Sequence, residues 1–111
     1  MPHCIIEYSS DLEMGAQQLI DAVMQGALDS ALFNVDDIKL RTISYENYQI
    51  ATGKKKFIHV AMKILSGRSD EQKRNLSQAV LARLDKLDLT CLSLTVEVLD
   101  IDREVYAKKI K

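Results

Sequence analysis

Residues 57–72 read FIHVAMKILSGRSDEQ and join a predicted strand to a predicted helix. Large apolar side chains occupy every second position up to residue 64, which is the period of a β-strand with one buried face. Ser69 is followed three residues later by Gln72, the spacing of a capping box at the start of a helix. This stretch therefore predicts a strand over residues 57–65, a tight turn, and a helix that begins at Ser69.

The first half of the chain predicts the same order of elements. Residues 2–9 have the pattern of a strand, and Ser10 with Glu13 forms another capping-box pair, at which a helix should begin. Apolar residues then recur at steps of three and four as far as Leu32, as on one face of a helix. Residues 38–50 alternate and predict one long strand or a bent pair of short strands.

The rest of the second half completes the pattern. The helix that begins at Ser69 is expected to carry its apolar face as far as Leu87, and a fourth strand is expected over residues 92–99. Gly53 and the three lysines that follow it predict a solvated turn between the halves. A short helix is expected from Arg103.

Together these elements predict one α/β domain over residues 1–111, with an internal repeat of about residues 2–50 and 56–100. Two βαβ units form a two-layer fold in which a four-stranded sheet carries both helices on one face. The other sheet face would then expose apolar residues such as Ile5 and Leu65. We expect copies of the chain to bury this face in a homo-oligomer, the alternative being a monomer with a partly solvated sheet.

Charge and hydropathy exclude several classes of partner. Fifteen Lys and Arg against sixteen Asp and Glu give a net charge of −1, which is not typical of a nucleic-acid binder. No apolar run reaches the roughly 18 residues of a membrane-spanning helix, so no membrane association and a cytoplasmic location are expected.

Cysteine and histidine do not form a metal-ligand pattern in the sequence. Cys4 and Cys91 stand far apart in apolar runs, and we expect both to be small core residues. His3 and His59 are also far apart, so no metal site is expected.

Pro2 is the only proline and directly follows Met1. Initiator methionine ahead of a small residue is normally removed, which would leave Pro2 with a free secondary amine. An α-amino group titrates near neutral pH, so a buried amine could move protons as a general base. With Met1 attached, Pro2 is an amide and cannot do so, and a proline at this position can also be a simple chain start.

Three basic residues are candidates for binding a carboxylated substrate. Arg68 lies in the turn before the predicted second helix, where backbone N–H groups and the helix dipole favour an anion; the alternative is a solvated surface arginine. Lys39 and Arg41 share one face of the predicted second strand. They would either bind a second carboxylate or mark an exposed face.

The chain resembles the 5-carboxymethyl-2-hydroxymuconate isomerase family of the tautomerase superfamily. The resemblance rests on PHCIIEYS at residues 2–9, IKLR at 38–41, FIHV at 57–60 and LSGRS at 65–69. It implies a homotrimer of duplicated βαβ units that uses neither a metal nor an organic cofactor. It also implies that Pro2 carries the proton and Arg68 binds a carboxylate of a muconate-type substrate from bacterial homoprotocatechuate breakdown.

At one position the sequence departs from the family pattern. The family's other arginine aligns most naturally with Lys39, which keeps the charge but loses the two-pronged guanidinium; Arg41 is the alternative. The sequence leaves open a phenylpyruvate-type tautomerase and a non-catalytic oligomer that binds a small carboxylate.

Overall fold

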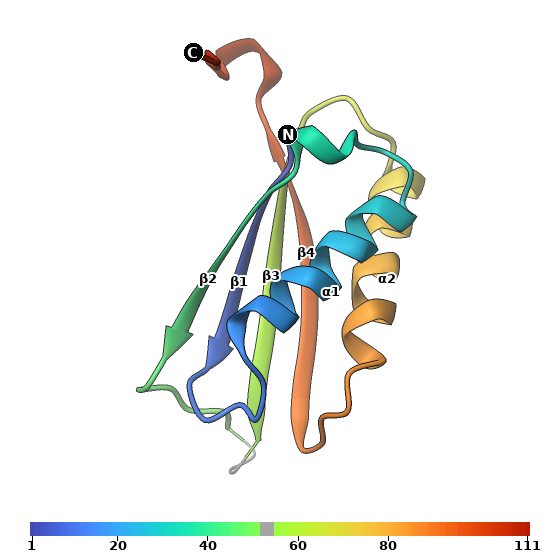
Figure 1. Ribbon diagram of the computed structural model, residues 1–111. Helices are drawn as coiled ribbons and strands as arrows, with labels where there is room; N and C mark the ends of the chain where they lie inside the picture. Colours follow the sequence, from blue (N-terminus) through green and yellow to red (C-terminus); the bar gives the residue numbers. More distant parts are fainter. Residues whose placement is uncertain (52–54) are drawn as a thin grey trace.

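The computed structural model describes residues 1–51 and 55–111, and in these residues a four-stranded sheet carries two α-helices on one face (Figure 1). The strands are β1 (His3–Ser9), β2 (Lys39–Tyr45), β3 (Lys56–Leu65) and β4 (Leu92–Ile101). The helices are α1 (Ala16–Asp29) and α2 (Asp70–Asp85), and short 3-10 helices span Val35–Asp37 (η1) and Arg103–Val105 (η2).

The sheet has the order β2-β1-β3-β4. β1 pairs with β2 and β3 pairs with β4 in parallel, whereas the central pair β1 and β3 is antiparallel. The predicted fold class, two βαβ units with both helices on one face, is confirmed. Because His3 lies opposite both Lys39 and Lys63, the beginnings of β1 and β2 meet the ends of β3 and β4 at one end of the sheet.

The core fills the space between this sheet and the helices. Its fully buried side chains alternate along the two central strands and recur at helical spacing on both helices, as expected when apolar surface drives the packing. They include Cys4, Ile6, Ile58, Val60, Met62, Leu19, Val23, Leu76 and Val80. Gly26 is required where the helices cross, because a Cβ atom there would lie 2.6 Å from the Cα atom of Val80.

Within residues 1–51 and 55–111, the opposite sheet face has no helix over it and mixes apolar with charged side chains, as predicted. Ile43 is 47% exposed and Leu99 is 40% exposed. Polar pairs lie between them, since the Tyr45 hydroxyl donates to Glu7, and His59 contacts Glu97. We call this surface the open face.

The start of the first helix was predicted wrongly. α1 begins at Ala16 and its N-cap is Gly15, whose backbone N–H donates to the Gln18 side-chain oxygen at 3.0 Å. Ser10, the predicted cap, instead donates its backbone N–H to the Tyr45 carbonyl at 2.9 Å. Residues 10–15 carry the chain from the sheet to the helix layer, and Leu12 is buried on the way.

Two predicted ends also differ. α1 ends at Asp29, because Ala31 takes a left-handed backbone conformation with φ 60°, so Leu32 lies beyond the helix. The strand predicted to reach Ile50 ends at Tyr45. The periodic pattern continued past α1 because Leu32 and Phe33 in the following loop also pack on the core. Past β2, the ring of Tyr48 packs against the ring of Phe57.

The second cysteine was placed wrongly as well. Cys4 is buried, but Cys91 is exposed and has φ 56°, directly before β4. The apolar run that suggested burial begins at Leu92.

The remaining predictions concern the second half. Ser69 and Gln72 form the predicted capping box, with the Ser69 hydroxyl accepting from the Gln72 backbone N–H at 3.1 Å. The expected short helix from Arg103 is η2. Of the predicted lysine turn, Lys56 begins β3, and residues 53 and 54 lie outside the described residues.

Candidate active site at the end of the sheet

The N-terminus lies at one end of the sheet (Figure 1), and Pro2 directly precedes β1. Its side chain is fully buried. Its carbonyl oxygen accepts the backbone N–H of Lys39 at 3.0 Å, and the Met1 amino group donates to the Asp37 carbonyl at 3.1 Å. These bonds fix the start of the chain against the segment that leads into β2.

The surroundings of the chain start favour a neutral amine. Burial lowers the pKa of the Met1 amino group below its ordinary value, and the nearby Lys39 ammonium lowers it further, while Asp37 acts in the opposite direction. With Met1 attached, the Pro2 nitrogen is part of a peptide bond and has no basic lone pair. The structure therefore supplies an environment for a neutral amine at this place.

Lys39 and Arg41 lie on the open face of β2, as predicted, and both are exposed. They differ in their neighbours. Lys39 lies opposite His3 in the sheet register, whereas Arg41 donates from one guanidinium nitrogen, Nη1, to the Nδ1 atom of His3 at 3.1 Å. The sequence prediction that they share a face is thus confirmed, and Arg41 is held by a side-chain partner.

His3 links Arg41 to the C-terminal segment. Its Nε2 atom lies 3.0 Å from the hydroxyl oxygen of Tyr106. Arginine can only donate, so Nδ1 must be the accepting nitrogen and the proton of the neutral ring is on Nε2. His3 therefore donates to Tyr106. Burial, followed by the Arg41 and Lys39 charges, lowers the pKa of His3 and favours this neutral form.

Arg68 lies in the turn between β3 and α2 and is half-buried. Its Nη2 atom donates to the Leu32 carbonyl at 2.9 Å, and the guanidinium carbon lies 5.7 Å from the centre of the Phe33 ring. The segment after α1 thus holds Arg68, which retains further N–H donors for an anion. These contacts do not include Pro2.

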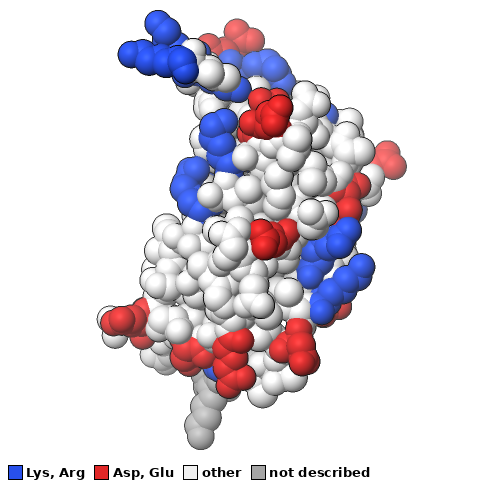
Figure 2. Space-filling model, in the orientation of Figure 1, with Lys and Arg blue, Asp and Glu red and all other residues white. Residues whose placement is uncertain are grey.

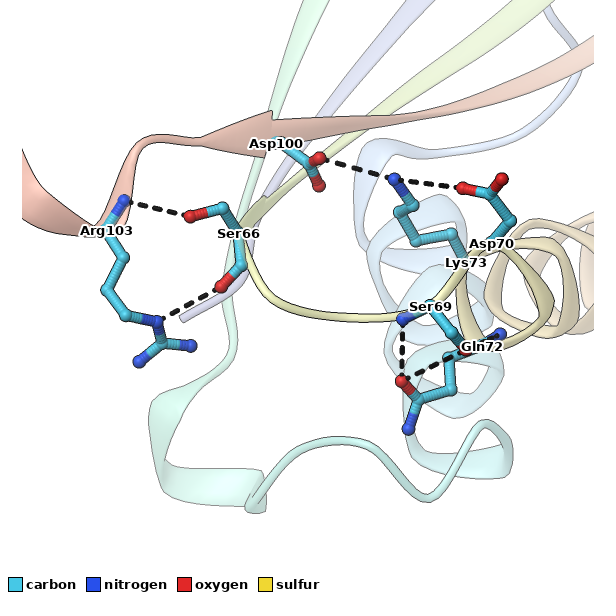
Figure 3. A network of polar contacts seen from close by, with 7 residues as sticks. All are labelled: Ser66, Ser69, Asp70, Gln72, Lys73, Asp100 and Arg103. Atoms are coloured by element: carbon cyan, nitrogen blue, oxygen red, sulfur yellow. Dashed lines mark hydrogen bonds and ion pairs between the residues drawn. The ribbon is translucent and has the colours of Figure 1, made fainter.

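The turn that carries Arg68 is anchored on both sides (Figure 3). Gly67 has φ 118°, a conformation that side chains rarely adopt. On one side Arg103 donates through its backbone N–H to the Ser66 hydroxyl and through Nε to the Ser66 carbonyl, both at 3.1 Å. On the other, Lys73 bridges Asp100 at 3.3 Å and Asp70 at 3.6 Å.

The predicted site residues therefore reach the same end of the sheet but form two groups. Pro2 and Lys39 are joined through the backbone, and Arg41 lies two residues further along β2. Arg68 lies across the end, against the segment after α1. Sequence reasoning missed the roles of His3 and Tyr106: His3 had a signal in its position beside Pro2, but Tyr106 is 103 residues away from it and had none.

Charge is unevenly distributed along the molecule. In the view of Figure 2, one group of Lys and Arg lies at the end that carries the C-terminus and another on the side where the helices lie, whereas Asp and Glu predominate at the opposite end. Surface hollows lie elsewhere, one between α2 and β4 beside Leu81 and one between the helices beside Ala22. The end that carries Pro2 thus has a group of Lys and Arg side chains, and neither of these two hollows includes Pro2.

No helix in the described part of the chain is both long and apolar enough to cross a bilayer. Among the same residues, no cluster of three or more His, Cys, Asp or Glu side chains could hold a metal ion.

The chain matches one family model and superposes on several solved structures. The family model described as 5-carboxymethyl-2-hydroxymuconate isomerase matches residues 2–110. A 5-carboxymethyl-2-hydroxymuconate isomerase from Deinococcus radiodurans R1 superposes with a TM-score of 0.76 at 24% identity, over 99% of this chain and 90% of that chain. A 5-carboxymethyl-2-hydroxymuconate delta-isomerase gives 0.69 at 24% identity, over 100% and 89%.

A fused 4-OT wild-type symmetric trimer superposes with a TM-score of 0.71 at 20% identity, over 96% of this chain and 93% of that chain. No curated protein sequence matches this chain.

Proposed function

Because this chain belongs to the 5-carboxymethyl-2-hydroxymuconate isomerase family, we propose that it isomerises a carboxylated 2-hydroxydienoate by proton transfer through Pro2. The family and its fold make the chain an isomerase of the tautomerase superfamily. The reaction would need no cofactor. A substrate of the 5-carboxymethyl-2-hydroxymuconate type, from aromatic breakdown, fits the cationic end of the sheet.

One observation carries the proposal: Pro2 is buried beside Lys39, at the sheet end where Arg41 and Arg68 also lie. Once Met1 is removed, the Pro2 nitrogen is a secondary amine in surroundings that already lower the pKa of the Met1 amino group. Neutral amine is the form that accepts a proton.

In the proposed reaction the Pro2 amine takes the proton of the 2-hydroxyl group. The oxygen becomes the ketone of a 2-oxo acid, and the electron pair moves along the conjugated system. The ammonium then returns one proton to a carbon further along, which regenerates the neutral amine. Proton and electrons balance without another reactant.

Substrate carboxylates would be bound by Arg68 and by Lys39 or Arg41. A guanidinium offers a carboxylate two parallel N–H bonds, whereas an ammonium offers a point charge. Arg68 keeps donors free beside its bond to Leu32. Two cationic positions on opposite parts of the sheet end suit a substrate with a carboxylate at each end.

We further propose that the chain works as a homotrimer. The open face exposes Ile43 and Leu99, and a structural neighbour is a symmetric trimer. Apolar surface of this kind is commonly buried between copies. Analytical ultracentrifugation tests the proposal, and a monomer over the working concentration range would contradict it.

The proline mechanism is tested on two forms of the same sequence, separated by intact mass: one that retains Met1 and one that lacks it. We expect ultraviolet-detected tautomerisation of a 2-hydroxymuconate-type substrate only by the form without Met1. Pro2→Ala in that form should lower kcat/KM by about 10²- to 10⁴-fold, the usual contribution of a positioned acid or base. Equal turnover by the two forms would overturn the mechanism.

The pH dependence gives a second readout. Burial and Lys39 should act on a Pro2 amine as they act on the Met1 amino group, and so lower its pKa below the ordinary value of such an amine. The base limb of the kcat/KM profile should therefore lie below that ordinary value, with activity lost as pH falls through the pKa of the amine.

A substrate panel separates the alternatives. The proposed activity requires preference for substrates with several carboxylates. Equal turnover of a monocarboxylate enol would indicate a phenylpyruvate-type tautomerase, and binding without turnover by the Met1-free form would indicate a non-catalytic carboxylate-binding protein.

A further inference from the structure

Three side chains, one of them His3 next to Pro2 in the chain, form a chain of hydrogen bonds that the proton transfer does not use. Arg41, on β2, contacts His3, on β1, and His3 contacts Tyr106, which follows η2. We propose that His3 and Tyr106 are positioning residues that hold the Arg41 guanidinium for a carboxylate of the substrate. This inference rests on the function proposed above and selects Arg41 over Lys39 as the second carboxylate-binding residue.

The bonds have a fixed direction. Arg41 has only donors, so it requires the bare Nδ1 atom of His3, which leaves the ring proton on Nε2. That proton is donated to the Tyr106 hydroxyl oxygen, which is 3.0 Å away. The donor-only Arg41 thus requires this tautomer of His3, and the Tyr106 hydroxyl stabilises it by accepting the Nε2 proton, as a second partner commonly does for a histidine ring.

Arg41 keeps most of its hydrogen-bonding capacity in this arrangement. A guanidinium has five N–H groups, and the bond to His3 occupies Nη1. The exposed side chain can therefore still present paired N–H groups to a carboxylate. Its long side chain loses rotational freedom to His3 before substrate arrives, which lowers the entropic cost of binding. Lys39 offers only a point charge.

The segment that carries Tyr106 is fixed to the body of the protein on both sides. Before it, Arg103 makes two hydrogen bonds to Ser66 (Figure 3), at the beginning of the turn that holds Arg68. After it, Lys108 pairs with Asp37 at 3.6 Å. The C-terminal segment thus connects the surroundings of Arg68 with those of Pro2 and places the Tyr106 hydroxyl against His3.

The local charges show why Arg41 needs a neutral partner. Lys39 and Lys63 lie opposite His3 on the two neighbouring strands, and Asp37, the acidic residue near the chain start, is paired with Lys108. A protonated His3 would add another cation and would lose its acceptor for Arg41. A neutral ring bonded to Tyr106 orients the guanidinium without neutralising its charge. The full charge remains available to a substrate anion.

The first test removes one oxygen atom by Tyr106→Phe. We expect KM for a substrate with carboxylates at both ends to rise about three- to tenfold, the value of one net hydrogen bond, with kcat within about twofold. KM for a monocarboxylate analogue that Arg68 can bind alone should not change. The matched control is Tyr48→Phe, which removes a tyrosine hydroxyl bonded to Asp11 at 2.8 Å outside the proposed site.

A double-mutant cycle shows whether Tyr106 acts through Arg41. Arg41→Gln should raise KM for the same substrate, and adding Tyr106→Phe to it should have no further effect. Full additivity of the two changes would overturn the inference. So would an equal effect of Tyr106→Phe and Tyr48→Phe on KM.

Substitutions of His3 test the direction of the bonds. His3→Gln supplies a side-chain oxygen that can accept and an NH₂ group that can donate, so it should retain KM within about threefold. His3→Leu has neither group and should raise KM as Tyr106→Phe does. Equal KM values for His3→Gln and His3→Leu would contradict the proposed role.

A measurement without substrate separates failure of this inference from failure of the proposed function. Nitrogen NMR of the His3 ring at pH 7.5 should show the proton on Nε2 in the wild-type protein, and a mixture of tautomers in Tyr106→Phe. A proton on Nδ1 in the wild type, or the same spectrum in both proteins, overturns the inference even if turnover is absent. The expected spectra with no turnover would leave the hydrogen-bond chain standing and reject the isomerase function.

Discussion

The two βαβ units share a topology but start their helices differently. In the second unit the Ser69–Gln72 capping box lies on the short turn that follows β3 and begins α2. In the first unit the Ser10–Glu13 pair has the same spacing and begins no helix, because α1 starts at Ala16 behind Gly15. A capping-box sequence therefore begins a helix only where the preceding turn places it in the helix layer.

The two units also contribute different residues to the candidate site at the sheet end. The first unit supplies Pro2, His3, Lys39 and Arg41, whereas the second supplies Arg68. Each unit supplies one anchor of the C-terminal segment, Asp37 from the first and Ser66 from the second. The proposed proton transfer therefore belongs to the first unit, and the second contributes one carboxylate-binding residue. The following predictions test how far this difference extends.

The largest expected difference concerns the two cysteines, Cys4 in β1 of the first unit and Cys91 directly before β4 of the second. Burial raises the pKa of Cys4 to about 12, while Cys91 is exposed. Since the thiolate is the reactive form, a thiol reagent at pH 7.5 should label Cys4 at least ~10²-fold more slowly than Cys91, because Cys4 must wait for opening of the core.

Mass spectrometry of labelled peptides over time measures both rates. Cys91→Ser should lack the fast phase and keep the slow one. Labelling of Cys4 as fast as that of Cys91 would show that the start of β1 opens freely.

The next largest effect is expected at the crossing of the helices, where the first unit supplies a glycine and the second a valine. Gly26→Ala should destabilise the protein by ~1–3 kcal/mol, despite the better helix propensity of alanine, because the new Cβ meets the Val80 backbone at 2.6 Å. Urea denaturation measures the loss. Gln25→Ala, on the exposed side of α1, should stay within about 0.5 kcal/mol of wild type.

Because the clash is with the backbone, truncating the partner by Val80→Ala should not restore stability to Gly26→Ala. Recovery in the double variant would mean that the side chain, and not the helix spacing, limits this contact.

The smallest expected effects come from substitutions at the two helix starts. Ser69→Ala should cost about 1 kcal/mol of folding free energy, whereas Ser10→Ala should cost less than ~0.5 kcal/mol, because only Ser69 caps a helix. Gly15→Ser should stabilise by a few tenths of a kcal/mol, about the difference between these caps, since its backbone is already extended.

Thermal and urea denaturation of the three variants compare the units directly. A loss for Ser10→Ala as large as that for Ser69→Ala would show that the first capping box forms in solution after all.

Much of the fold could be predicted because it depends on local periodicity. β3 has large buried residues at every second position from Ile58 to Ile64, and α2 has both a cap and an apolar face, so each was found close to its observed bounds. The errors lie at the ends of α1 and β2 and at Cys91. Loop residues such as Leu12 and Leu32 pack on the core and extend an apolar pattern that no longer belongs to a helix or strand.

The residues of the candidate site could be predicted only where residues close together in the sequence indicate their chemistry. Pro2 behind Met1, Arg68 behind Gly67, and the spacing of Lys39 and Arg41 are visible in the sequence. The partners of these residues are not, because Arg68 bonds to Leu32 and His3 bonds to Tyr106 across long stretches of chain. Such contacts depend on which strand ends meet.

The sequence by itself determined the two βαβ units, the face of each strand that turns inward, the capped second helix and the candidate proline, because periodicity and spacing act over a few residues. Only the tertiary structure decided that β1 and β3 run antiparallel at the centre of the sheet. That pairing brings the beginnings of one unit's strands against the ends of the other's. As a result, the start of the chain, the Arg68 turn and the C-terminal segment meet at one end, which is where the proposed function needs its amine and its carboxylate-binding residues.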